Sequence, residues 1–190
     1  LKEGDKVLIN ATYLAEPLVK AVYREALAAG ANPEIKIALN GTQKIFYDTA
    51  SDEQLKYIAP TAKYIYENYD GLLNIVAPFN VKELEGVDHA QKQMVSMART
   101  HLKKRFLQRA AAKELNWTLC VYPTDAAAQE CGMSGSEYED FVYGACLLYK
   151  NDAVAEWEKV AANQQKIVDF LKGKELVQYL GRDIDISFST

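Results

Sequence analysis

The sequence predicts an α/β fold: a mostly parallel, doubly wound (Rossmann-like) sheet with helices on both faces. Two observations lead to this prediction. Short apolar runs alternate with longer stretches whose apolar residues recur every three or four positions, and this strand–helix alternation repeats four times. The predicted strands are nearly continuous apolar runs, which is typical of a parallel sheet buried on both faces. The 190 residues are enough to bury one core of this kind.

The first predicted strand–helix unit begins with a strand over residues 7–11. A helix follows from Pro17, because proline is tolerated in the first turn, and Gly30 is expected to end it. Residues 35–39 form the next predicted strand.

The second unit is a helix capped by Ser51, with Gln54 at the position that completes a capping box. Pro60 is expected to kink or restart this helix, because proline disrupts a helix interior. Residues 72–77 then form the third strand, and one long helix is predicted over about 88–114.

The fourth predicted strand, residues 117–122, is followed by a short helix and then by a helix with Ser136 and Glu139 as its expected capping box. Tyr138, Phe141 and Val142 fall on one face of that helix, so we expect them to be buried.

The last predicted helix is capped at Asn151-Asp152, and residues 176–180 form the fifth strand. Residues 184–188 alternate strictly between apolar and polar side chains, which predicts an antiparallel strand.

The composition indicates a soluble globular protein, with 49% hydrophobic and 25% charged residues. No apolar run approaches the ~20 residues that span a bilayer, so we expect no membrane association. The net charge of -4 argues against a nucleic-acid-binding protein. Cys120, Cys131 and Cys146 lack paired spacing, which indicates thiols in a reducing, cytoplasmic compartment.

The sequence has no dinucleotide fingerprint. The first strand-to-helix turn, residues 10–16, contains no glycine and therefore cannot form the backbone cradle of a pyrophosphate site. No phosphate-binding loop of the GxxxxGK[ST] type occurs elsewhere.

The two histidines are weak candidates for metal ligands. His89 and His101 lack HExxH spacing and lie ~18 Å apart along the predicted long helix, too far to share one ion. We expect solvated or capping roles for both.

Five carboxylates are possible cation ligands, but their positions favour structural roles. Glu137, Glu139 and Asp140 lie in the first turn of a capped helix, where the helix dipole favours negative charge. Asp183 and Asp185 are interpreted as solvent-facing residues of an edge strand.

A run of basic residues on the predicted long helix is interpreted as a solvated helix face. A dimer contact with acidic residues is the second interpretation, and nucleic-acid binding is the third. The run comprises Arg99, Lys103, Lys104, Arg105, Arg109 and Lys113.

One region of the chain carries a family resemblance. The segment YPTDAAAQECGMSGSEYEDFVYGACLL, residues 122–148, resembles the signature of the thermophilic metallo-aminopeptidases of the aminopeptidase T and aminopeptidase S type. The Gly132-Met133-Ser134 turn and residues 137–143 are its most specific parts. Residues 4–9 and the helix that contains Trp157 are also similar to that family.

The resemblance implies a homodimeric exopeptidase in which two divalent ions, zinc or cobalt, remove N-terminal residues from peptides. It also implies that the Glu, His and Asp ligands belong to a second domain, and no position here matches those motifs. We therefore assign no catalytic, cofactor-binding or metal residue in this chain. We expect residues 1–182 to form an N-terminal domain that walls the active site, and residues 183–190 to begin the strand leading into a missing catalytic domain. The chain alone is expected to be inactive.

Two alternatives stay open at this point. One is the N-terminal domain of an iron-dependent ring-opening dioxygenase, since some such enzymes resemble this family. The other is a non-enzymatic α/β domain that binds a small molecule in the crevice at the carboxyl ends of the strands.

Overall fold

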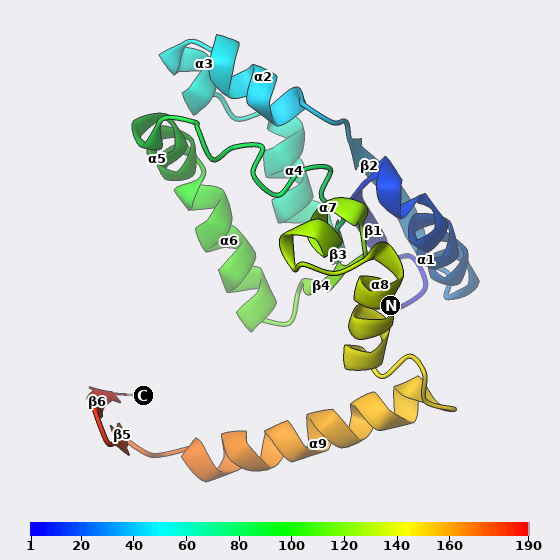
Figure 1. Ribbon diagram of the computed structural model, residues 1–190, viewed down its shortest axis with the longest axis vertical. Helices are drawn as coiled ribbons and strands as arrows, with labels where there is room; N and C mark the ends of the chain where they lie inside the picture. Colours follow the sequence, from blue (N-terminus) through cyan, green and yellow to red (C-terminus); the bar gives the residue numbers. More distant parts are fainter. Residues whose placement is uncertain (190) are drawn as a thin grey trace. The chain divides into compact units, whose positions relative to one another are not determined.

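Figure 1 shows the computed structural model, which describes residues 1–189. The chain divides into two compact units, Leu1–Val142 and a second unit from Tyr143 on, and each is described by itself. The expected domain boundary at residue 182 stays a prediction.

The first unit is built on a four-stranded sheet in the order β2-β1-β3-β4. All of its neighbouring strands run parallel. The strands are β1 (Lys6–Thr12), β2 (Asn32–Ala38), β3 (Gly71–Val76) and β4 (Asn116–Val121). The predicted parallel sheet is therefore confirmed.

One face of the sheet is covered by α1 (Glu16–Ala28). Ile9 and Ile75 point to this face from the two central strands and pack in one buried cluster with Val19 of the helix. Pro17 lies in the first turn of α1, as predicted. Gly30 follows the helix with a φ of 78°, a left-handed conformation that suits glycine.

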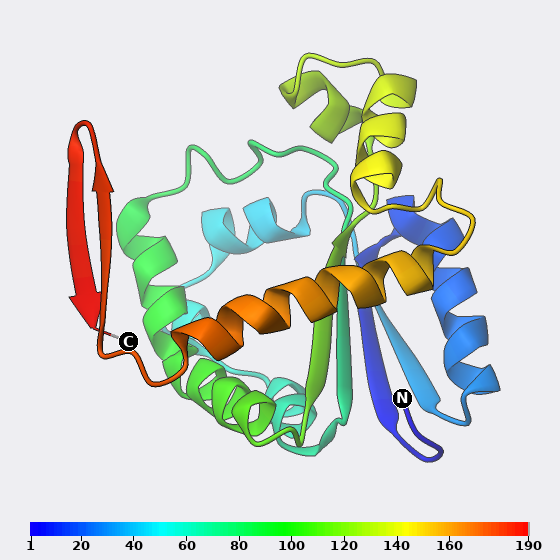
Figure 2. The same ribbon diagram turned by 90° about the horizontal axis from the view of Figure 1, so that it is seen from below.

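The opposite face is covered by α4 (Pro60–Asn68) and α6 (Thr100–Ala111). Leu8 and Leu72 of the central strands pack there with partly buried side chains of both helices. Figure 2 shows α1 and α6 on opposite sides of the strands. The predicted doubly wound arrangement, with helices on both faces, is thus confirmed.

Between β2 and α4 lie two short helices, α2 (Thr42–Thr49) and α3 (Asp52–Lys56). The predicted capping box is confirmed: the Ser51 side chain accepts a hydrogen bond from the Gln54 backbone, and the Gln54 side chain accepts one from the Ser51 backbone. Pro60 restarts the chain as the first residue of α4.

The single long helix predicted over 88–114 is wrong in detail. The structure contains two helices, α5 (His89–Ala98) and α6, which meet at Arg99. The ψ angle of Arg99 is 1°, far from the helical value of about −42°, so the helix axis is interrupted at this residue. Asp88 caps α5 by accepting a hydrogen bond from the Ala90 amide.

After β4 come α7 (Asp125–Glu130) and α8 (Gly135–Ala145). The capping box of α8 lies two residues earlier than predicted. The Ser134 hydroxyl accepts a hydrogen bond from the Glu137 amide, and the Glu137 carboxylate accepts one from the Ser134 amide at 2.8 Å. The predicted pair, Ser136 and Glu139, lies inside the helix because the chain becomes helical at Gly135.

The prediction that one whole face of α8 is buried is wrong for Phe141. Val142 is buried and Tyr138 is half-buried, whereas Phe141 is 60% exposed and stacks on Tyr138 with a centroid distance of 6.5 Å. In a helix, the side chain at i+4 points in nearly the same direction as that at i, whereas the side chain at i+3 points further to one side. Here only the Tyr138–Val142 side of the helix faces the interior.

The second unit contains α9 (Ala153–Leu171), which is capped by Asp152 as predicted. The Trp157 indole donates a hydrogen bond to the Cys146 carbonyl at 2.9 Å. β5 (Leu176–Gly181) and β6 (Ile184–Ser189) form a separate two-stranded antiparallel sheet. The antiparallel last strand is confirmed. The expected fifth strand forms, but it pairs with β6 and does not extend the parallel sheet of the described chain.

Candidate functional site: a pocket above the central strands

The strand order creates a switch point between β1 and β3. From β1 the chain continues to β2, at one edge of the sheet. From β3 it continues to β4, at the opposite edge. In open parallel sheets, the crevice at the carboxyl ends of two such strands is the common place for a ligand.

Two asparagines lie in the middle of these two strands. Asn10 and Asn74 are register partners in β1 and β3, and the Asn10 Nδ2 atom donates a hydrogen bond to Asn74 Oδ1 at 3.0 Å. Each lies two residues beyond a buried leucine, Leu8 or Leu72, so the strand alternation carries both amides to the α4/α6 face. The pair leaves Asn10 Oδ1 as an acceptor and Asn74 Nδ2 as a donor toward the space above the strands.

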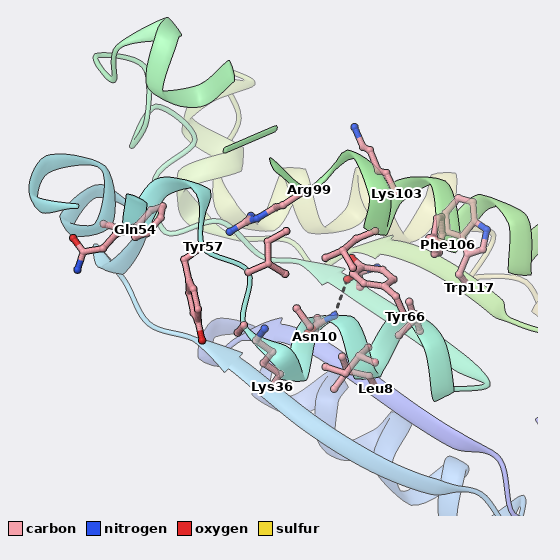
Figure 3. Close-up of a pocket in the computed structure, with 18 residues that line it drawn as sticks. Leu8, Asn10, Lys36, Gln54, Tyr57, Tyr66, Arg99, Lys103, Phe106 and Trp117 are labelled. Atoms are coloured by element: carbon pink, nitrogen blue, oxygen red, sulfur yellow. Dashed lines mark hydrogen bonds between the residues drawn. The ribbon is translucent and has the colours of Figure 1, made fainter. Parts of the chain in front are cut away.

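A pocket of about 630 Å³ lies above this amide pair (Figure 3). Its floor comes from the strands, and its walls come from α4, α6 and the segment around Tyr57. The volume falls within the range of about 300–1,000 Å³ that is typical of small-molecule sites. The residues that line the pocket include Asn10, Lys36, Tyr57, Tyr66, Asn74, Arg99, Lys103, Phe106 and Trp117.

One end of the pocket is aromatic. The Tyr66 and Phe106 rings meet edge to face at 6.1 Å, and Phe106 meets Trp117 at 5.6 Å. Trp117 is 54% exposed, so much of its surface is open to solvent or to a ligand. An indole held by a neighbouring ring and still accessible offers a stacking surface for a flat ligand.

The charged side chains that line the pocket are all positive. Lys36, Arg99 and Lys103 line it, and no aspartate or glutamate does. Within residues 1–189, no ion pair joins any of these three cations to a carboxylate. Figure 3 shows Arg99 directed toward Tyr57, while Lys103 points away from the strands.

The solvated face that we predicted holds for five of the six basic residues. Arg99, Lys103, Lys104, Arg105 and Lys113 are exposed, and Arg99 and Lys103 also line the pocket. For Arg109 the prediction is wrong, because this side chain is buried at 6% exposure. Its guanidinium donates hydrogen bonds to backbone carbonyls at the end of α4, and these bonds replace hydrogen bonds to water.

The structure places the two histidines on different helices, His89 at the start of α5 and His101 in α6, and both are exposed. The His101 Nδ1 atom lies 3.2 Å from the Ala98 carbonyl oxygen, a local contact within the helical segment. Among the described residues, no group of three histidines, cysteines or carboxylates comes together in a way that could hold a metal ion.

The five carboxylates considered as possible cation ligands make local contacts or face solvent. Hydrogen bonds from the Ser134 hydroxyl and amide lower the pKa of Glu137, which agrees with its role in the capping box. Glu139 and Asp140 are exposed on α8. Asp185 accepts a hydrogen bond from Gln178 Nε2 at 2.8 Å within the β5–β6 pair, and Asp183 lies in the turn between those strands.

Sequence reasoning did not find the amide pair or the cations around it. The available signal was one asparagine at a similar position in each of two apolar strands, Asn10 and Asn74. A polar residue in the middle of a strand that is buried on both faces needs a partner, and here each asparagine is the partner of the other.

The comparisons with known proteins agree with the resemblance of the signature region. All of residues 1–190 match the family model described as thermophilic metalloprotease (M29). The chain belongs to this metalloprotease family. A search of curated proteins finds no match.

A solved structure, wild-type AmpT from Thermus thermophilus, resembles the chain with a TM-score of 0.70. The two share 20% sequence identity, and the match covers 97% of this chain and 48% of AmpT. At this identity the likeness supports the fold. The chain thus spans about half the length of AmpT. No helix in residues 1–189 is both long and apolar enough to cross a membrane.

Proposed function

We propose that this chain is the N-terminal domain of a metal-dependent aminopeptidase that removes N-terminal residues from peptides. The observation that carries the proposal is the match of the whole chain, residues 1–190, to the M29 metalloproteases. The signature segment, residues 122–148, adds the aminopeptidase character through its resemblance to the aminopeptidase T and S type.

We assign the catalytic metal, zinc or cobalt, to a part of the protein outside these residues. A catalytic zinc site needs about three protein ligands and an open position for water. The described residues do not fit such a group, because no three ligand side chains gather among them. No step of hydrolysis is therefore assigned to this chain, and its proposed role is to wall the active site and to support the catalytic domain and a homodimer.

The comparisons give no support to the two alternatives. The matching family model describes metalloproteases, not ring-opening dioxygenases and not binding proteins without enzyme activity.

A comparison of two protein lengths tests the proposal. The 190-residue chain and a longer protein that also carries the proposed catalytic domain would be assayed on leucine p-nitroanilide, after removal of metal with a chelator and after addition of zinc or cobalt. We expect metal-dependent release of nitroaniline from the longer protein alone. No hydrolysis by the longer protein with either metal, or oxygen consumption with iron, would contradict the aminopeptidase proposal.

Calorimetry tests the proposed location of the metal. We expect no stoichiometric micromolar binding of zinc or cobalt to the metal-stripped 190-residue chain. Tight binding by this chain would instead direct attention to His89, His101 and the carboxylates of α8.

The homodimer and the cytoplasmic location are further proposals. The family resemblance supports the homodimer, and the unpaired spacing of the three cysteines supports the cytoplasmic location. Light scattering of the longer protein would give twice the monomer mass for a dimer, and the monomer mass would contradict it. Fractionation of the source cells would test the location.

A further inference from the structure

The pocket above β1 and β3 has an ordered chemistry across the sheet. Lys36, Asn10, Asn74 and Leu119 occupy one row of the parallel register, one residue from each strand. Neighbouring strands lie ~4.8 Å apart, so this row spans ~14 Å from β2 to β4. A cation therefore lies at one end of the row and an amide pair lies in the middle. Trp117, at the aromatic end of the pocket, lies on β4 two residues before Leu119.

Within residues 1–189, no ion pair supplies a counterion at the cationic end. Lys36 comes from β2 and Arg99 from the junction of α5 and α6, two segments far apart in sequence. In a chain of net charge -4, three cations and no carboxylate line this one pocket. A cleft lined by one sign of charge concentrates ions of the opposite sign.

The amide pair adds directional groups. The hydrogen bond between the two side chains uses Asn10 Nδ2 as the donor and Asn74 Oδ1 as the acceptor. The Asn10 Oδ1 and Asn74 Nδ2 atoms remain available to a ligand, and the two central strands hold them in position. Few, well-placed polar groups in a mostly apolar pocket are what orient a small ligand.

The geometry points to a binding site for a small organic anion with a flat apolar body. Lys36 and Arg99 hold the anionic group, the Asn10–Asn74 pair contacts the middle of the ligand, and Phe106 and Trp117 pack against the apolar body. The anion is a carboxylate or a phosphate monoester, since both present oxygens to lysine and arginine. This inference is independent of the proposed peptidase activity, because it concerns only residues of the first unit.

The first experiment is calorimetry of the 190-residue chain with 4-phenylbutyrate, phenyl phosphate and the neutral isostere 4-phenylbutyramide. We expect saturable binding of one or both anions below ~1 mM and at least tenfold weaker binding of the amide. Binding of phenylbutyrate alone identifies a carboxylate ligand, and binding of phenyl phosphate alone identifies a phosphate. No saturable binding of either anion, or equal binding of the amide, would overturn the inference. Inorganic phosphate tests the anion without an apolar body, and affinity equal to that of phenyl phosphate would also overturn it.

The second experiment locates the ligand. The two tryptophans are Trp117 and Trp157, so a Trp157→Phe variant leaves Trp117 as the only source of tryptophan fluorescence when excitation is at wavelengths that tyrosine does not absorb. We expect the anion to change this fluorescence with the same dissociation constant as in calorimetry. Binding without any change in Trp117 emission would place the ligand elsewhere.

The variants distinguish a built site from general attraction to a basic surface. Arg99→Gln and Lys36→Gln should each weaken anion binding at least tenfold, whereas Lys104→Gln, which removes an exposed cation of α6 outside the pocket, should leave it within twofold. Asn74→Asp changes the shape little but adds a negative charge to the floor, so it should also weaken binding. Arg99→Lys keeps the charge and should recover part of the affinity, which guards against a variant that has simply misfolded. Equal binding by Arg99→Gln, Lys36→Gln and Lys104→Gln would contradict the site.

Discussion

The Arg109 guanidinium of α6 donates a hydrogen bond from Nη1 to the Tyr69 carbonyl at 2.8 Å. The same nitrogen donates to the Tyr66 carbonyl at 3.0 Å, and Nη2 donates to the Glu114 carbonyl at 3.1 Å. A buried arginine thus satisfies carbonyls at the end of α4 and beyond the end of α6. It fastens both helices to the same side of the sheet.

We predict that Arg109→Leu lowers the free energy of unfolding by about 3 kcal/mol, because buried carbonyls lose a charged donor. Arg105→Leu is the matched control on the same helix; its exposed side chain should cost no more than about 0.5 kcal/mol. Urea unfolding followed by circular dichroism measures both. Equal losses in the two variants would show that the buried hydrogen bonds contribute little.

The corrected capping box of α8 gives a second prediction. Ser134→Ala should destabilise the protein by about 1 kcal/mol, because the Glu137 amide loses its acceptor. Ser136→Ala should be close to neutral, since Ser136 lies within the first turn and does not cap the helix. Thermal unfolding of the two single variants shows which serine caps the helix. A larger loss of stability for Ser136→Ala would support the capping residue predicted from the sequence.

The hydroxyl of Tyr69 gives a pH-dependent prediction. Burial, together with its hydrogen bond to the Glu34 carboxylate, raises the pKa of Tyr69 to about 12. A pKa raised above the unfolded value of about 10 favours the protonated folded state, so this stabilisation is complete below pH ~10 and is lost as the pH rises toward the folded value. The difference in stability between the wild type and Tyr69→Phe should therefore be constant up to pH ~10 and shrink above it.

Spectrophotometric titration of tyrosinate at alkaline pH provides the direct check on Tyr69. A tyrosine that ionises at about pH 12 in the wild type should be missing from Tyr69→Phe. Glu34→Gln removes the neighbouring carboxylate and should move this titration toward lower pH. Stability curves of the wild type and Tyr69→Phe that stay parallel from pH 10 to 12 would contradict the prediction.

Adjacent residues of α8 give the fourth prediction. Phe141→Ala should cost less than about 1 kcal/mol because the ring is 60% exposed. Val142→Ala should cost about 1.5 kcal/mol, because it removes two buried carbon groups. Denaturant unfolding of both variants tests this order. A loss of 3–5 kcal/mol for Phe141→Ala, the range for a buried phenylalanine, would mean that the ring is covered in solution.

The parts of the fold that the sequence predicted are those set by neighbouring residues. The Ser51–Gln54 box and the left-handed turn at Gly30 depend on a few adjacent positions, and both are confirmed. The parallel sheet follows from apolar runs separated by helices, which leave few alternative connections. The family was found through the contiguous signature of residues 122–148 and is confirmed by the match of the whole chain.

The features that the sequence did not predict depend on distant residues. An apolar run such as 176–180 looks the same whether it joins a parallel sheet or a hairpin, so its partner could not be chosen. Nothing in the local sequence distinguishes Arg109 from its exposed basic neighbours. Its burial depends on the carbonyls of Tyr66 and Tyr69, which are distant in sequence. The pocket depends on the register between Asn10 and Asn74, which lie 64 positions apart.

The β5–β6 pair has a consequence for how the chain behaves over time. Its register puts Val177 opposite Phe188 and Tyr179 opposite Ile186, so one side is apolar and only two strands hold it. An isolated two-stranded hairpin is marginally stable in water. Where nothing covers that side, its backbone amides should exchange with solvent far faster than those of β1, which has a strand on each flank. A protease would then cut first near the turn at Arg182, and leave the parallel sheet intact.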